Sequence, residues 1–194
     1  MFDTYALSAE HLALREAARD LVEDKIAPFA ALVDEEARFP QEAYDALRAA
    51  ELHAVHVPEA YGGNGADALA TCLVIEQVAR GCASSSLIPA VNKLGSLPVL
   101  LAGTEAQKQQ WLGPLAAGES LFCYALSEAD AGSDVSSMRT RAVRDGDGWV
   151  VGGVKRWITN AGHGDSYVVF AVTDPAAPRA GTSARSSWPR PTAG

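Results

Sequence analysis

The chain has few cysteines and few basic residues. It has 194 residues and three cysteines, Cys72, Cys82 and Cys123, an odd number with no metal-ligand spacing. An odd count excludes a fully paired disulfide framework and favours reduced thiols in the cytoplasm. Lys and Arg number 16 against 24 Asp and Glu, a formal charge of −8. This balance argues against nucleic acid or an anionic membrane as partner, because few cations are available to neutralise phosphates.

Long apolar runs are missing as well. No continuous apolar stretch approaches the roughly 20 residues that cross a bilayer, so we expect a soluble protein with no membrane partner. The first residues include Asp3 and no long apolar run, which does not fit a secretion signal. What is abundant is hydrophobic sequence, 48% of residues. That content is enough for a sizeable core and excludes disorder as the default.

Residues 1–118 have the periodicity of a helical domain. Ser8 and Thr104 are good N-cap residues ahead of apolar residues at helical spacing. We predict helices near 8–26, 40–52, 66–83, 88–101 and 104–111, the fourth of them apolar nearly all round and buried. Residues 114–118 are predicted to form a linker.

Residues 119–175 have the shorter period of strands. We predict strands at 121–126, 139–144, 149–151, 154–159 and 167–172, with a hairpin turn at 145–148. The predicted fold class is therefore α+β, an all-α domain followed by a small antiparallel β-barrel or sandwich.

Two histidines, His53 and His56, lie three residues apart and raise the question of a metal pair. No third ligand of a suitable kind is placed to complete a site, so we predict that the chain binds no metal there.

The segment Tyr124 to Asp134 has the composition of a ligand-binding loop. It follows the predicted strand 121–126 and changes abruptly to hydroxyls, carboxylates and small residues. After Glu128 no side chain larger than Asp occurs before Val135, so a bulky or phosphorylated ligand could lie against exposed backbone amides. A plain Gly-Ser turn between two strands is the alternative interpretation.

Two motifs in register resemble the flavin-dependent acyl-CoA dehydrogenase family. The first motif consists of Leu126-Ser127-Glu128, two further residues, and then Ala131-Gly132-Ser133-Asp134. The second motif is residues 155–161, Lys-Arg-Trp-Ile-Thr-Asn-Ala. Similarity extends through 57–63, 94–98 and 103–108, so it covers about residues 7 to 175. The chain is similar to the N-terminal helical domain and most of the middle β-domain of that family, without its C-terminal helical domain.

The resemblance implies an FAD-dependent dehydrogenation of acyl-CoA to 2-enoyl-CoA, with an electron-transfer flavoprotein as acceptor and a homo-oligomeric assembly. It also implies that Ser133 contacts both cofactor and acyl-CoA. The cofactor-binding residues that it implies are Tyr124, Ala125, Leu126, Ser127, Gly132, Ser133, Trp157, Ile158 and Thr159. An indole gives a flavin ring a flat apolar neighbour, and a threonine hydroxyl can hydrogen-bond to the edge of the ring.

Two departures from the family pattern affect the expected activity. Ala129 and Asp130 stand where many family members have Pro and Gly, which changes the expected turn. The family's catalytic base is a glutamate of the helical domain that follows the barrel, and no residue here matches it. Glu128 could be taken for a base, but the matched family residue belongs to the cofactor loop. We therefore expect no catalytic residue in this chain and no activity of the isolated chain.

The last residues, 176–194, lack apolar periodicity and are rich in Pro and Arg. We predict that they are disordered and cannot supply the next barrel strand. If residues 185–190 are back-translated with assumed GC-rich codons, an alternative reading frame encodes an apolar segment of the kind the family has at this point. We therefore infer a frameshift after about Ala184. The alternative function is a non-catalytic remnant, or a partner subunit that binds a full-length homologue.

Overall fold

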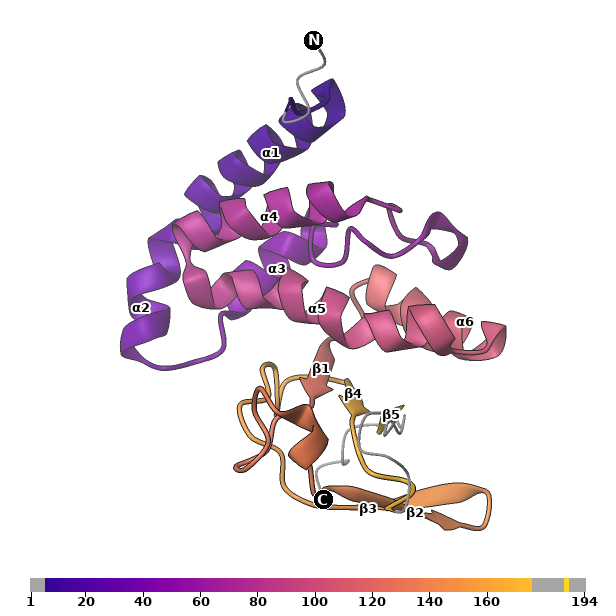
Figure 1. Ribbon diagram of the computed structural model, residues 1–194. Coiled ribbons are helices and arrows are strands. Elements are labelled where there is room, and N and C mark those ends of the chain that lie inside the picture. Colours follow the sequence, from indigo (N-terminus) through magenta and orange to yellow (C-terminus); the bar gives the residue numbers. More distant parts are fainter. Residues whose placement is uncertain (1–5, 176–186, 189–194) are drawn as a thin grey trace. The chain divides into compact units, whose positions relative to one another are not determined.

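A computed structural model describes residues 6–175 and 187–188, and it divides into two compact units. The first comprises residues 1–119 and is helical, and the second comprises residues 120–194 and contains the strands (Figure 1).

The described part of the helical unit contains six α-helices, and side-chain caps fix the start of three of them. Ser8 and Asp67 accept hydrogen bonds from the backbone amides of His11 and Ala70, and Thr104 forms a capping box with Gln107. Short π and 3₁₀ turns connect the helices at Val22–Ile26, Ala27–Phe29 and Glu59–Tyr61. The helices are α1 Ala9–Leu21, α2 Ala30–Glu35, α3 Gln41–Ala49, α4 Ala68–Gly81, α5 Ala83–Ala102 and α6 Glu105–Ala116.

The core of this unit lies where α1 and α5 pack against α4. Val74 and Val78 of α4 are fully buried, and Ile88 of α5 is nearly so. A Cβ atom at Gly81 would lie 2.3 Å from Cγ1 of Val22, so the glycine permits the close approach of α4 to the chain that follows α1.

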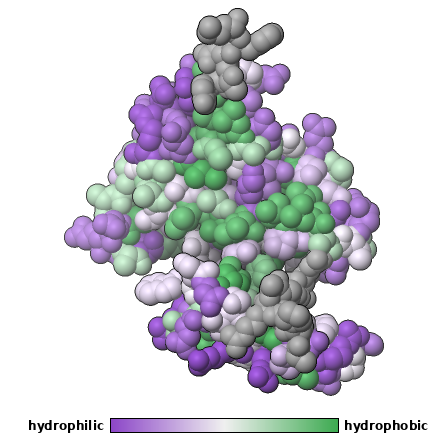
Figure 2. All heavy atoms as spheres, viewed as in Figure 1, coloured by the Kyte–Doolittle hydropathy of each residue, from purple (hydrophilic) through white to green (hydrophobic). Residues whose placement is uncertain are grey.

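Three predictions for the helices need correction. Helix α5 begins at Ala83 rather than at 88, because only Cys82, with an extended backbone, separates it from α4. Residues 114–116 of the predicted linker are the end of α6, which continues through Pro114 to Ala116, and residues 117–118 form the turn that follows. Leu87, Leu94 and Leu101 recur every seven residues on α5 and are exposed, so this helix is not buried all round. Figure 2 shows apolar patches on the surface of this unit.

Among the described residues, one helix, α5, is long and apolar enough to cross a membrane, although the sequence showed no continuous run of that length. Of its most apolar window 44% is buried within the structure, and one helix of this length and composition is weak evidence for a membrane span.

Two small sheets are present in the described residues of the second unit. Its strands are β1 Phe122–Ala125, β2 Arg141–Asp145, β3 Gly148–Gly152, β4 Ser166–Val169 and β5 Ser187–Trp188. The first sheet has the order β1-β4-β5, and the second is the β2-β3 hairpin. The predicted hairpin turn is confirmed, with Asp145 paired to Gly148 and Gly146 at φ +55°.

The predicted α+β fold class, a helical domain followed by a small β domain, is confirmed, whereas three details of the predicted β part differ from the structure. Strand β1 runs parallel to β4, because the chain between them makes a long crossover that includes the hairpin. Residues 154–159 form no strand, since Gly153 at φ +154° and Trp157 at φ +60° interrupt the extended backbone. The tail does supply a strand, because β5 pairs antiparallel with β4, and such pairing needs backbone groups rather than apolar periodicity. The predicted disorder and frameshift otherwise concern residues outside the described part of the chain.

Candidate functional site

The two sequence motifs meet in the second unit. The backbone N–H of Arg156 donates to the carbonyl of Ser127 at 2.9 Å. One residue earlier, the Lys155 ammonium donates to the carbonyl of Leu126 at 2.9 Å and to Oε1 of Glu128 at 2.8 Å. The loop that follows β1 is thus held against the segment that follows β3 at three consecutive residues.

Glu128 is the centre of this junction. Its side chain is 8% exposed and that of Lys155 is 10% exposed. The Glu128 carboxylate also accepts hydrogen bonds from the backbone amides of Arg139, at 2.7 Å, and Thr140, at 3.0 Å. Burial alone would raise the pKa of Glu128, but the hydrogen bonds from Lys155 and these amides outweigh it and lower the pKa to about 2. A carboxylate held ionised in this way is a poor proton acceptor, so Glu128 is unsuited to act as a base.

A tight turn follows Glu128 directly. Reciprocal backbone hydrogen bonds join Glu128 and Ala131, and the two departures from the family pattern, Ala129 and Asp130, lie exposed at the tip. Asp130 forms an ion pair with Arg139 at 3.3 Å. The turn is therefore closed without the Pro-Gly pair, and the two residues that follow Ala131, Gly132 and Ser133, are exposed.

Asp134, the last residue of the first motif, accepts hydrogen bonds from the hydroxyls of Ser136 and Ser137. With Glu128 and Asp130 it completes a group of three loop carboxylates, all of which have partners within the unit.

Trp157 has the most unusual conformation in the site. Its backbone has φ +60°, a region that bulky residues rarely adopt, and its side chain is 90% exposed. An exposed indole on a strained backbone gains nothing from core packing. Strain of this kind is concentrated at ligand-binding positions, which makes Trp157 a ligand-contact candidate.

Asn160 anchors the far end of the second motif. It also has positive φ, +66°, and its side-chain amide donates to the carbonyl of Phe122 in β1 at 2.9 Å. The backbone carbonyl of Asn160 accepts from the N–H groups of His163 and Gly164. Sequence reasoning assigned no role to Asn160 or to Lys155, although both lie inside the second motif, and their position there was the available signal.

The predicted cofactor residues differ in exposure. Ala125 is buried in β1, and Tyr124 is half-buried with its ring 5.0 Å from that of Phe170. Leu126, Ser127, Ile158 and Thr159 are half-buried, whereas Gly132, Ser133 and Trp157 are exposed. The contacts above bring Leu126 and Ser127 to the segment that carries Trp157.

His53 and His56 are buried in the core of the helical unit, and each has a hydrogen-bond partner there. His53 Nε2 lies 2.9 Å from the carbonyl oxygen of Leu115, and His56 Nε2 lies 2.7 Å from Oγ of Ser96. Burial lowers the pKa of both, that of His56 to about 4. Within the described residues no group of three His, Cys, Asp or Glu side chains could hold a metal ion.

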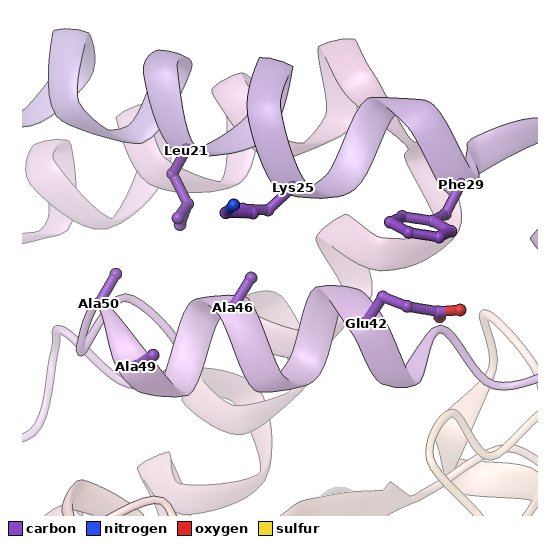
Figure 3. Close-up of a pocket in the computed structure, with 7 residues that line it drawn as sticks. All are labelled: Leu21, Lys25, Phe29, Glu42, Ala46, Ala49 and Ala50. Carbon is purple, nitrogen blue, oxygen red and sulfur yellow. The ribbon is translucent and has the colours of Figure 1, made fainter.

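An open apolar groove of about 410 Å³ also lies on the helical unit, between α3 and the chain from the end of α1 to the 3₁₀ turn (Figure 3). It shares no residue with the predicted site. Its lining residues are Leu21, Lys25, Phe29, Glu42, Ala46, Ala49 and Ala50.

Comparison with known proteins identifies the class to which this combination of helical unit and loop site belongs. The model of the acyl-CoA dehydrogenase N-terminal domain matches residues 8–119, and that of the acyl-CoA dehydrogenase middle domain matches residues 123–185. The chain therefore belongs to the acyl-CoA dehydrogenase family.

Individual relatives agree with this assignment. The chain is 58% identical to the probable acyl-CoA dehydrogenase FadE25 of Mycobacterium tuberculosis over 174 residues, 90% of this chain and 45% of the relative. Among solved structures, the acyl-CoA dehydrogenase of Geobacillus kaustophilus matches with a TM-score of 0.88 and 31% identity, over 96% of this chain and 49% of that one. An acyl-CoA dehydrogenase of Bacillus anthracis complexed with FAD matches with a TM-score of 0.79 and 32% identity, over 89% of this chain and 30% of that one. The chain thus spans less than half the length of these relatives.

Proposed function

We propose that the second unit supplies one wall of an FAD site in an acyl-CoA dehydrogenase. The observation that carries the proposal is the exposed, strained indole of Trp157, held next to the Ser127 loop by the Lys155 and Arg156 contacts. An indole face suits the flavin ring, and the Ser127 and Thr159 hydroxyls suit its polar edge. When bound, FAD would accept a hydride from the β-carbon of the acyl thioester.

The residues of this chain would bind and orient rather than transfer protons. Ser133, exposed beyond the turn, is proposed to contact both cofactor and acyl-CoA. The product would be a 2-enoyl-CoA, an electron-transfer flavoprotein would be the electron acceptor, and the assembly would be a homo-oligomer. None of the three cysteines, all of which lie in the described part of the chain, forms a disulfide, which fits a cytoplasmic location.

The second candidate function is that of a non-catalytic subunit that binds a full-length homologue. The engagement of Glu128, Asp130 and Asp134 favours it, because a dehydrogenase needs a base for the α-proton. Turnover of acyl-CoA with an artificial electron acceptor separates the two functions. We expect no turnover by the 194-residue chain alone, whereas turnover that Glu128→Gln abolishes would show that Glu128 is a base after all.

Titration of the purified chain with FAD tests the proposed site. Trp157→Ala removes the proposed ring contact and is expected to raise the Kd for FAD roughly threefold to tenfold. Ser127→Ala should weaken binding by the worth of one hydrogen bond, on the order of 1 kcal/mol. Trp149→Ala is the matched control, since Trp149 is a partly exposed tryptophan of the β2-β3 hairpin. Equal affinities in all three variants and the unsubstituted chain would contradict the assignment.

A further inference from the structure

The Lys155–Glu128 ion pair holds two loops together at the cost of removing two charged groups from water. Both side chains are nearly buried, at 10% and 8% exposure, so both charges are largely removed from water. Apolar side chains of similar shape at such positions often stabilise a fold as well or better, because they incur no loss of hydration. Fold stability alone therefore does not account for the pair.

The geometry of the pair shows what a charge provides there. The Lys155 ammonium has several donors, and it places one on the Leu126 carbonyl and another on Glu128. Glu128 in turn fixes the backbone amides of Arg139 and Thr140 at the approach to β2. The pair thus links three backbone segments. These are the start of the loop after β1, the segment that leads into β2 and the segment that follows β3.

Two of the proposed flavin contacts, Ser127 and Trp157, lie close in sequence to these contacts. Ser127 stands between Leu126 and Glu128, and Trp157 lies two residues beyond Lys155. Trp157 is itself 90% exposed, so packing of its own side chain does little to fix its position. Its place depends on the backbone before it, which the Lys155 contacts and the Arg156–Ser127 hydrogen bond hold.

We propose that Lys155 and Glu128 are positioning residues for the flavin site, which set the separation of Ser127 and Trp157 without touching the ring. This inference rests on the proposed function. It predicts that the charges matter to FAD binding more than to folding.

The test compares four forms of the full 194-residue chain: unsubstituted, Lys155→Met, the double variant Glu128→Gln/Lys155→Met, and Arg141→Met. Lys155→Met leaves the Glu128 charge without its cation and should lower stability. The double variant is neutral and close in shape, so its urea unfolding midpoint should return towards that of the unsubstituted chain. Arg141→Met is the control, because Arg141 is an exposed arginine of the same unit and gives the same charge change as Lys155→Met.

Two readouts separate positioning from folding. The Kd for FAD should rise about tenfold in the double variant, because Ser127 and Trp157 are no longer held at the right separation, although its midpoint is restored. Hydrogen exchange at the Arg156 amide, which reports the bond to Ser127, should accelerate in the same variant without FAD. Arg141→Met should change neither quantity.

The outcomes that overturn the two proposals differ. An unsubstituted chain that does not bind FAD would refute the proposed function, and with it the role of the pair towards the flavin. An unsubstituted chain and a double variant with equal affinity for FAD would refute the positioning role alone. An unchanged Arg156 exchange rate in the double variant would show that Lys155 does not hold this junction.

Discussion

Gly164 is the position at which one added methyl group should most disturb the support of the site. It lies in the turn between Asn160 and β4, and a Cβ atom built there would be 2.3 Å from Sγ of Cys123. The carbonyl oxygens of Leu121 and Asn160 would lie at 3.2 and 3.3 Å. Ordinary contact begins near 3.4 Å, so the methyl group or its neighbours must move by about 1 Å.

Little room exists for that movement. Cys123 is fully buried in β1, and the turn is fixed by the hydrogen bond from the Gly164 N–H to the Asn160 carbonyl at 2.7 Å. Overpacking of a well-packed core costs roughly 1–3 kcal/mol, and the rigid neighbours place Gly164→Ala near the upper end of that range. The displaced turn includes Asn160, so the second motif should also lose part of its anchor.

Urea unfolding followed by tryptophan emission measures this effect, since three of the four tryptophans belong to the second unit. Gly152→Ala is the matched control, because nothing lies within 4 Å of a Cβ atom built at Gly152. Adding Cys123→Ala to Gly164→Ala removes the clashing sulfur and should recover about 1–2 kcal/mol as a coupling energy. The reasoning fails if Gly164→Ala unfolds at the same urea concentration as Gly152→Ala, or if Cys123→Ala brings no recovery.

Three further predictions concern stability. Burial, with smaller effects of Lys93 and His53, lowers the pKa of His56 from 6.5 to about 4, so the unfolded chain binds the proton first. Stability of the helical unit should fall by up to about 3 kcal/mol as the pH drops from 6.5 to 4, and His56→Gln should flatten this slope in urea titrations. For Glu128 the stabilisation is complete above pH 4.5 and should disappear as the pH falls to about 2, with a slope that Glu128→Gln removes. Thr104→Ala deletes half of a capping box and should cost about 1 kcal/mol by thermal unfolding, whereas Thr104→Ser should restore most of it.

Local signals in the sequence predicted much of the helical unit. Ser8 and Thr104 cap the helices they were expected to cap, because the capping interaction lies within four residues. The short helix α2 was not predicted, and its six residues carry little periodicity. The exposure of Leu87 and Leu94 could not be predicted either, since an apolar residue on a helix does not reveal what covers it.

At the site, too, features that depend on local sequence could be predicted, and features that depend on contacts between distant residues could not. The motifs located the loop after β1 and the segment after β3, and the structure joins them through Lys155 and Arg156. The parallel pairing of β1 with β4 depends on residues some 40 positions apart, which alternation within one strand does not encode. The positive φ of Trp157 was also hidden, because its sequence neighbours favour extended structure and the contacts of Lys155 and Asn160 override them.

The central claim is that FAD contacts the two joined motifs of the second unit. Amide chemical-shift mapping of the 194-residue chain with FAD tests it residue by residue. We predict that the shift changes concentrate in residues 124–133 and 157–159, with the amide and indole N–H of Trp157 among the largest. In Trp157→Ala the shift changes of residues 124–133 should become smaller. Shifts confined to the helical unit, or no shifts at saturating FAD, would contradict the claim.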